Sequence, residues 1–208
     1  MLKHEIYRKL IHLSAIIIPI LYYFVVKSQI VAISILLPIA LICVVVDAAR
    51  IENPDLKNKF YKVFGSQLRD EEASSLTGAS YLLTSSVIAI AIFTKEIAFL
   101  AISYLVVGDT FAAMFGLKLG KRMIIRTRKT IEGLIGSFLA CAILGLICYF
   151  LKFKDVIGPG HNPPLAIIMI LIGALAASIS EVTNLHINDN ISIPIISGIV
   201  MSIIYIFI

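Results

Sequence analysis

Charged residues and cysteines are both scarce in this chain of 208 residues. Asp, Glu, Lys and Arg together make up 15% of the sequence and hydrophobic residues 59%, with a mean hydropathy of +0.98. A soluble domain cannot hide so much apolar surface, so the composition predicts that the bilayer is the solvent. Cys43, Cys141 and Cys148 lie in apolar runs without CxxC spacing, which favours small packing residues over metal ligands or a disulfide.

Polar interruptions between the apolar runs are short. A membrane-spanning helix needs about 20 mostly apolar residues. Candidate spans lie roughly at 10–26, 29–47, 75–93, 96–117, 131–151, 164–184 and 191–208. They occupy most of the chain and leave no room for a separate soluble domain. The predicted fold is therefore all-α, a polytopic membrane protein of about seven transmembrane helices with one integral membrane domain over 1–208.

Lys and Arg are divided unequally between the alternate ends of these runs. Fourteen lie in the N-terminal segment and two of the loops, against four in the alternate loops. This bias predicts a cytoplasmic N-terminus and, in a prokaryote, a multi-pass plasma-membrane protein whose basic loops face the cytoplasm. Within 52–72, Leu56, Phe60, Val63 and Phe64 recur at helical spacing. The segment is either an amphipathic helix on the cytoplasmic headgroups or a solvated helical loop.

One carboxylate interrupts the apolar run 97–117. Placing Asp109 at membrane depth costs about 2.5–3.5 kcal/mol, so it is expected to have a partner or a task. Ala112, Gly116 and Gly120 lie on the same helical face. Such small-residue faces are typical of close helix packing. They also offer lateral room for a ligand against the backbone.

A basic cluster precedes the run that begins near Thr130. Arg126, Arg128 and Lys129 stand just before the predicted helix N-terminus, where unpaired N–H groups and cationic side chains favour phosphate. The alternative is that these cations only follow the positive-inside rule. Glu132 favours the phosphate interpretation, because topology requires no glutamate there and a magnesium–phosphate site needs carboxylates.

An acidic cluster ends the sixth run and opens the seventh. Glu181, Asp189 and Asn190 are predicted to lie at the cytoplasmic face, although their loop has no Lys or Arg. This composition makes sense if the two carboxylates face the basic cluster or a cation. The alternative is an ordinary turn with Asx caps and a first-turn proline.

A further polar cluster opens the first run. Glu5, Arg8 and His12 form one helical face, with Lys9 beside them. His12 either moves a proton near neutral pH or is a polar residue at headgroup level. Arg50, at the cytoplasmic end of the second run, is similarly open to two interpretations. Polar clusters from distant parts of the chain are thus predicted to converge on one membrane face.

These motifs, in this order, resemble a family of CTP-dependent lipid-alcohol kinases that includes dolichol kinase, phytol kinase and the CTP-dependent diacylglycerol kinases. The matching pieces are Glu5-x-x-Arg8-Lys9-x-x-His12, Gly108-Asp109-Thr110-Phe111-Ala112-Ala113-x-x-Gly116-x-x-x-Gly120, Lys129-Thr130-x-Glu132-Gly133, and Glu181 with Asp189-Asn190-x-x-x-Pro194. The middle two are shared with membrane phosphatidate cytidylyltransferases. Those enzymes tend to close with Lys-Asp and a Pro-Gly-His-Gly-Gly-like segment, which this chain lacks.

The resemblance implies transfer of the terminal phosphate of CTP to a lipid hydroxyl, giving a lipid monophosphate and CDP. Asp109, with Asp189, would hold Mg²⁺ on the phosphates. Glu132, Glu181 or Asp189 would orient the hydroxyl or accept its proton, and the sequence does not decide among them. The expected nucleotide-binding residues are Gly116, Gly120, Lys121, Arg126, Arg128, Lys129, Thr130 and Asn190. The expected lipid-headgroup or supporting residues are Arg8, Lys9, His12, Arg50 and Glu181.

The favoured lipid is an isoprenoid alcohol such as dolichol, with diacylglycerol as the other candidate, and no nucleic acid is expected as a partner. Two alternative functions remain. One is a cytidylyltransferase that makes a CDP-lipid. The other is a small transporter with Asp109 as an intramembrane relay, which fits less well because the charges gather at one face.

Overall fold

The computed structural model describes residues 2–26, 28–65, 68, 70–124, 127, 129–153, 162–183 and 187–208, apart from the side chains of 2–6, 70 and 71. Arg126, Arg128 and the side chain of Glu5 therefore lie outside the described residues. The helices are α1 (Leu2–Ser14), α2 (Ile17–Ile20), η1 (Leu21–Val26), α3 (Gln29–Glu52), α4 (Pro54–Phe64), η3 (Asp70–Ala73), α5 (Gly78–Ile92), α6 (Lys95–Leu119), α7 (Ile131–Leu151), α8 (Pro163–Val182) and α9 (Asp189–Tyr205).

The predicted all-α fold is confirmed. Within the part of the chain that the structure describes there is no strand, and one isolated bridge joins Met123 to Thr130. Polar residues begin several helices by accepting an otherwise unpaired backbone N–H. Asn53 caps α4 ahead of Pro54, Thr130 caps α7 and Asn188 caps α9.

Helices occupy all the predicted apolar runs. Five are long and apolar enough to cross a membrane, namely Tyr7–Val26, α3, α6, α7 and α8, whereas α5 and α9 are apolar but shorter. The chain is thus a multi-pass membrane protein. The expected count of about seven spans stays a prediction for α5 and α9, because α5 begins after its N-cap at Thr77 and α9 ends at Tyr205, which leaves 15 and 17 residues.

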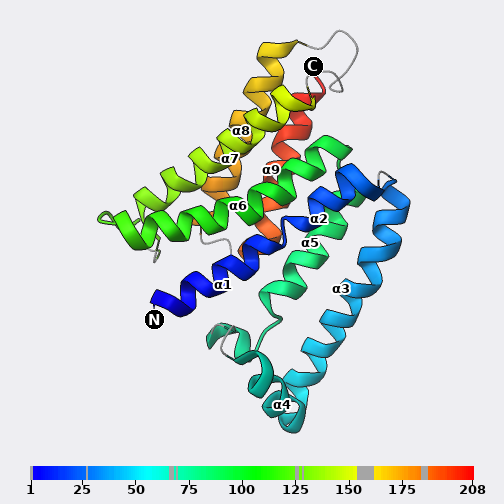
Figure 1. Cartoon of the computed structure of the whole chain (residues 1–208), viewed down its shortest axis with the longest axis vertical. Coiled ribbons are helices and arrows are strands. Elements are labelled where there is room, and N and C mark those ends of the chain that lie inside the picture. The colour runs from blue at the N-terminus through cyan, green and yellow to red at the C-terminus, as the bar shows by residue number, and fades with distance from the viewer. Residues whose placement is uncertain are drawn as a thin grey trace.

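Helix α6 lies at the centre of the molecule. It contacts α1, α5, α7, α8 and α9, and most of its length from Ile97 to Val107 is buried. In the view of Figure 1, α6 and α1 lie between the α3–α5 pair and the group formed by α7 and α8. Asp109 therefore sits on the helix that touches most of the others.

The small-residue faces of α6 and α7 meet each other, as the packing interpretation predicts. A Cβ added to Gly133 would lie 2.9 Å from the Ala112 carbonyl oxygen, and one added to Gly120 would lie 2.8 Å from Thr130 Cγ2. The lateral space beside Gly116 and Gly120 is thus filled by α7 and its cap rather than left open. Both glycines have a packing role, and their direct contact with nucleotide stays a prediction.

Candidate active site

Asp109 is held by two side chains from α1. Lys9 Nζ lies 2.5 Å from Asp109 Oδ1, and His12 Nε2 lies 3.5 Å from Asp109 Oδ2. The Lys9 and Asp109 side chains are only 5% and 14% exposed. A buried carboxylate is tolerated when a cation and hydrogen bonds compensate it. The partner that the sequence required for Asp109 is therefore Lys9, with His12 beside it.

Lys129 joins the end of α8 to the start of α9. Its Nζ lies 2.6 Å from Asp189 Oδ2 and 3.8 Å from Glu181 Oε1, and it also donates to the Glu181 carbonyl oxygen. The acidic cluster therefore faces the basic one at Lys129, whereas Arg126 and Arg128 lie outside the described residues. The capping interpretation holds as well, because Asn188 Oδ1 accepts a hydrogen bond from Asn190 N at 3.0 Å.

The buried Glu181 carboxylate connects these two clusters. It interacts electrostatically with Lys129 and Asp189 on one side and with Lys9 and Asp109 on the other. Among the described residues, its Oε2 atom is buried without a hydrogen-bond partner. Three carboxylates and two lysines thus share one region, and an unpartnered buried oxygen there is costly unless a ligand or water satisfies it.

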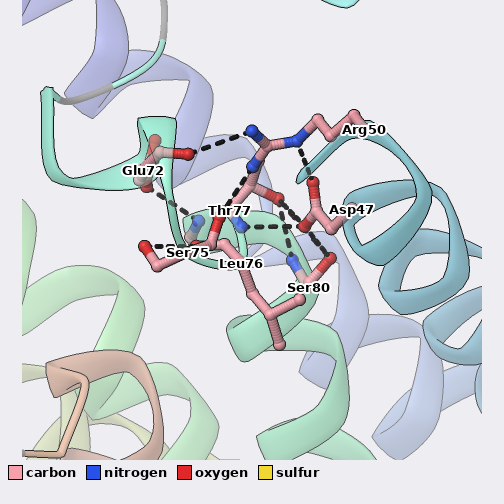
Figure 2. Close-up of polar contacts among 8 residues, drawn as sticks. Asp47, Arg50, Glu72, Ser75, Leu76, Thr77 and Ser80 are labelled. Carbon is pink, nitrogen blue, oxygen red and sulfur yellow. Dashed lines mark hydrogen bonds and ion pairs between the residues drawn. The ribbon is translucent and has the colours of Figure 1, made fainter. Parts of the chain in front are cut away.

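A second buried ion pair lies between α3 and the start of α5 (Figure 2). Arg50 Nε donates to Asp47 Oδ1 at 2.7 Å, and both side chains are almost fully buried. Asp47 Oδ2 accepts three more hydrogen bonds, from Thr77 N and Oγ1 at 2.8 Å each and from Ser80 Oγ at 2.6 Å. The Asp47 carboxylate therefore fixes the first turn of α5 to α3.

Arg50 also fixes the segment before α5. Its guanidinium donates to the Glu72 carbonyl at 3.0 Å and the Ser75 carbonyl at 2.9 Å, and lies 4.9 Å from the centre of the Phe60 ring. Glu72 Oε1 in turn accepts from Gly78 N at 2.8 Å. Arg50 is 1% exposed, so of the two expected roles the structure gives it the supporting one rather than contact with headgroups.

This segment is tied to α9 as well. Asn190 Nδ2 donates to the Gly78 carbonyl oxygen at 3.0 Å. The contact places a predicted nucleotide-binding residue between the Lys129 cluster and the α3–α5 wall. Sequence reasoning missed Asp47 and Glu72 as site residues, although Asp47 stands three residues before Arg50, at the spacing of a helical ion pair.

A cavity of about 590 Å³ lies between these groups. Arg8, His12, Asp47, Glu72, Asp109 and Asn190 contribute polar atoms to its lining. Apolar side chains from α1, α3, α4 and α5 form the remaining walls. Its size falls in the range of about 300–1,000 Å³ found for small-molecule sites. Polar side chains from distant parts of the chain thus line one space that has an apolar side, whereas Lys129, Glu181 and Asp189 lie outside its lining. That all the clusters lie at one membrane face stays a prediction.

Other predicted residues lie outside the cavity lining. Glu132 Oε2 accepts a hydrogen bond from Arg122 N at 3.3 Å, which steadies the connection between α6 and α7. Thr130 Oγ1 accepts from Gly133 N at 3.1 Å as the cap of α7. Lys121 is exposed. The structure thus gives Glu132 and Thr130 local contacts around the start of α7, whereas Glu181 and Asp189 meet at Lys129.

The described carboxylates fit a magnesium ion only together with a phosphate ligand. Within the described ranges, no group of three or more His, Cys, Asp and Glu side chains is arranged to hold a metal alone. Mg²⁺ at phosphate sites usually takes one or two protein carboxylates and completes its shell with phosphate and water. The unpartnered Glu181 Oε2, near Asp109 and Asp189, is the kind of oxygen such an ion would take.

Comparison with known proteins agrees with this geometry. Residues 2–186 match the cytidylyltransferase family. The chain belongs to this family. The residues that bring Lys9, Asp109, Lys129 and Glu181 together all lie inside the matched region, so the cytidylyltransferase match covers most of the candidate site.

Relatives of this cytidylyltransferase family member include two named kinases. An uncharacterized protein of Rickettsia prowazekii is 30% identical over 193 residues, covering 90% of this chain and 88% of that one. CTP-dependent diacylglycerol kinase 1 of Eremothecium gossypii is 28% identical over 175 residues, covering 77% and 55%. Its Saccharomyces cerevisiae counterpart is 26% identical over 215 residues, covering 96% and 73%. The resemblance to CTP-dependent lipid kinases and their cytidylyltransferase relatives is thereby confirmed.

Proposed function

We propose that this protein is a CTP-dependent lipid kinase that transfers the γ-phosphate of CTP to the hydroxyl of a membrane lipid. The observation that carries the proposal is the place of Asp109 and His12. They line a cavity with apolar walls, and Asp109 interacts with the Glu181 carboxylate of the Lys129 cluster. A lipid hydroxyl and a polyphosphate can thus meet at one point. The names of the two fungal relatives support CTP as the donor.

The Lys129 cluster would receive the nucleotide phosphates. Lys129, one-third exposed, supplies positive charge to the triphosphate and to the charge that develops on the transferred group. Asp109 and Asp189 would hold Mg²⁺, with Glu181 Oε2 as a further oxygen. When bound, the ion neutralises phosphate charge. Asn190 lies beside this cluster and holds the turn before α5 in place.

The α1 side of the site would receive the lipid hydroxyl. His12 lines the cavity and is oriented by Asp109 Oδ2, so it is placed to accept the hydroxyl proton. The bond from the γ-phosphorus to the β–γ bridging oxygen breaks, a bond from that phosphorus to the lipid oxygen forms, and CDP leaves. Lys9 pairs with Asp109 and offsets the cost of burying its carboxylate.

Diacylglycerol is the first lipid to test. Both named relatives are diacylglycerol kinases, which favours diacylglycerol over the isoprenoid alcohol that the sequence alone suggests. An isoprenoid alcohol presents a similar terminal hydroxyl and remains the alternative substrate within the same reaction.

The fate of an isotope label placed on one phosphorus atom of CTP tests which reaction the protein catalyses. Purified protein in liposomes receives diacylglycerol or a polyprenol, Mg²⁺, and CTP labelled on either the α- or the γ-phosphorus. We expect γ-label in the lipid product and none from the α-position. Asp109→Asn should lose about 100-fold or more of the rate. If the γ-label is released as pyrophosphate and none enters lipid, the kinase proposal is wrong.

A cytidylyltransferase is the second candidate, because the family description itself favours it. With phosphatidate in place of diacylglycerol, that reaction would move α-label into the lipid as a CDP-lipid and release γ-label as pyrophosphate. The same two labels therefore separate the two functions in a single experiment.

A further inference from the structure

The residues that line the cavity beside Asp109 change from polar to apolar along α3 and along the segment that runs from α1 into α2. Near the N-terminus the lining runs from Arg8 and His12 on α1 to Ala15, which follows α1, and Ile18 on α2, and on α3 it runs from Asp47 back to Ile42. At 1.5 Å per residue, Asp47 to Ile42 spans about 7.5 Å along α3. In both segments the lining is thus polar at one end and apolar at the other. This arrangement matches an amphiphilic ligand.

The apolar side of the cavity reaches the outer surface of the helices. Ile11 on α1 is 40% exposed, while Ile42 and Val46 on α3 are 63% and 46% exposed. All three line the cavity. By contrast, the α5 lining residues Ser80 and Leu82 are buried in the protein. The open side therefore lies along α1 and α3, where a multi-pass protein contacts lipid.

Helix α4 covers the polar end of this opening. It follows α3 directly after Glu52, and its Phe60 and Phe64 both line the cavity. The two rings lie 4.9 Å apart, and Arg50 holds Phe60 from the α3 side. The wall made by α4 is therefore aromatic and fixed to the buried Asp47–Arg50 pair.

We infer that the lipid substrate enters the cavity sideways from the bilayer, between α1 and α3 and beneath α4. Its apolar chain lies against Ile11, Ile18, Ile42 and Val46, and its hydroxyl meets His12 and Asp109. This inference rests on the proposed lipid kinase function and adds the route and the residues that select the lipid. The chemical class of the occupant is a long-chain lipid with one terminal polar group.

Photo-cross-linking tests the route without depending on turnover. Protein in liposomes is irradiated with a diacylglycerol that carries a diazirine on an acyl chain, and the labelled peptides are mapped. We expect labels on 11–18 and 42–46 that excess dioctanoylglycerol displaces. Labels on the outer face of α7, around Ile143 and Ile147, should not be displaced, because bulk lipid makes them. Displaceable labels found only outside 11–18 and 42–46 would overturn the route.

Tryptophan substitutions test the route by kinetics. Ile42→Trp and Val46→Trp should narrow the opening and raise the KM for long-chain diacylglycerol by about tenfold, with the KM for CTP unchanged. Val45→Trp is the control, because Val45 is 64% exposed on the same helix and lies outside the cavity lining. It should stay within about twofold of the parent. Equal effects of all three variants would contradict the route.

The two proposals fail separately. If no lipid receives γ-phosphate but diacylglycerol displaces the labels on 11–18 and 42–46, the kinase proposal is wrong and the proposed lipid route is still supported. Full kinase activity without displaceable labels on these segments overturns the route alone. The cross-linking uses the unmodified protein, so it decides the route even if a tryptophan variant does not fold.

Discussion

Lys9 and Asp109 are 100 positions apart in the chain, and their ion pair joins α1 to α6. Removing one partner of a buried pair leaves an uncompensated charge, which costs far more than removing both. Asp109 thus has two separable roles, one in holding α1 on α6 and one in the proposed chemistry.

Substitutions at this pair separate the two roles. Lys9→Met should lower the free energy of unfolding by about 3–5 kcal/mol, because Asp109 stays buried without its cation. The double variant Lys9→Met/Asp109→Leu should recover most of that stability and remain inactive. Thermal unfolding in detergent and γ-phosphate transfer measure the two effects. A double variant that is no more stable than Lys9→Met would contradict the ion-pair account.

Lys129 is the cation to test at the phosphate end of the site. Lys129→Gln should reduce kcat/KM for CTP by about 100-fold, because the phosphates lose the lysine that pairs with Asp189. Lys118→Gln removes an exposed charge near the end of α6 and should change little. Steady-state rates at varied CTP, with insertion checked by membrane fractionation, compare the two. Equal rates for both variants would remove Lys129 from the site.

At the scale of elements, buried polar contacts join α3, α4 and α5. Arg50 bonds the backbone before α5, stacks on Phe60 of α4 and pairs with Asp47 of α3. Since Asp47 also binds the first turn of α5, the wall of the cavity depends on a small number of groups.

Changing Arg50 should disturb the lipid side of the cavity first. Arg50→Ala leaves Asp47 buried without its cation and frees two carbonyls, so we expect a loss of about 3–5 kcal/mol and a raised KM for lipid. Arg50→Lys should recover part of both, since lysine keeps the charge but not the forked donors. Lys59→Ala on the exposed side of α4 is the control. Thermal unfolding and lipid titration in mixed micelles give the two readouts, and parental values for Arg50→Ala would contradict this role.

The existence and type of the elements were predictable because they depend on local pattern. Apolar runs of nearly 20 residues predict the helices, and the polar residue Thr130 predicts the start of α7. The lengths of α5 and α9 were not predictable in the same way, because α5 begins after Thr77, later than the apolar pattern suggests, and α9 ends at Tyr205, before the apolar run does. The sequence also could not decide whether a small-residue face packs against a helix or binds a ligand, because that depends on where the neighbouring helix lies.

For the whole molecule, the side of the membrane on which the site lies remains to be measured. The excess of Lys and Arg in alternate loops predicts a cytoplasmic site. Cysteines introduced at Lys121 and Lys152, with the three native cysteines replaced by serine, should differ in labelling. A membrane-impermeant maleimide applied to intact cells should label the Lys152→Cys protein and reach Lys121→Cys only after permeabilisation. The opposite pattern would reverse the orientation.

The sequence by itself determined that this is a helical membrane protein, that Asp109 needs a partner, and that the chain resembles CTP-dependent lipid enzymes. These features depend on composition, on spacing within a helix and on short motifs. Only the tertiary structure decided that the partner is Lys9, that Lys129 meets Glu181 and Asp189, and that Asp47 and Arg50 build the wall of a cavity. Apart from Asp47 with Arg50, these contacts join distant residues; Thr77 with Asp47 and Asn190 with Gly78 are 30 and 112 positions apart. The cation that pairs with a buried carboxylate such as Asp109 therefore depends on how the helices pack.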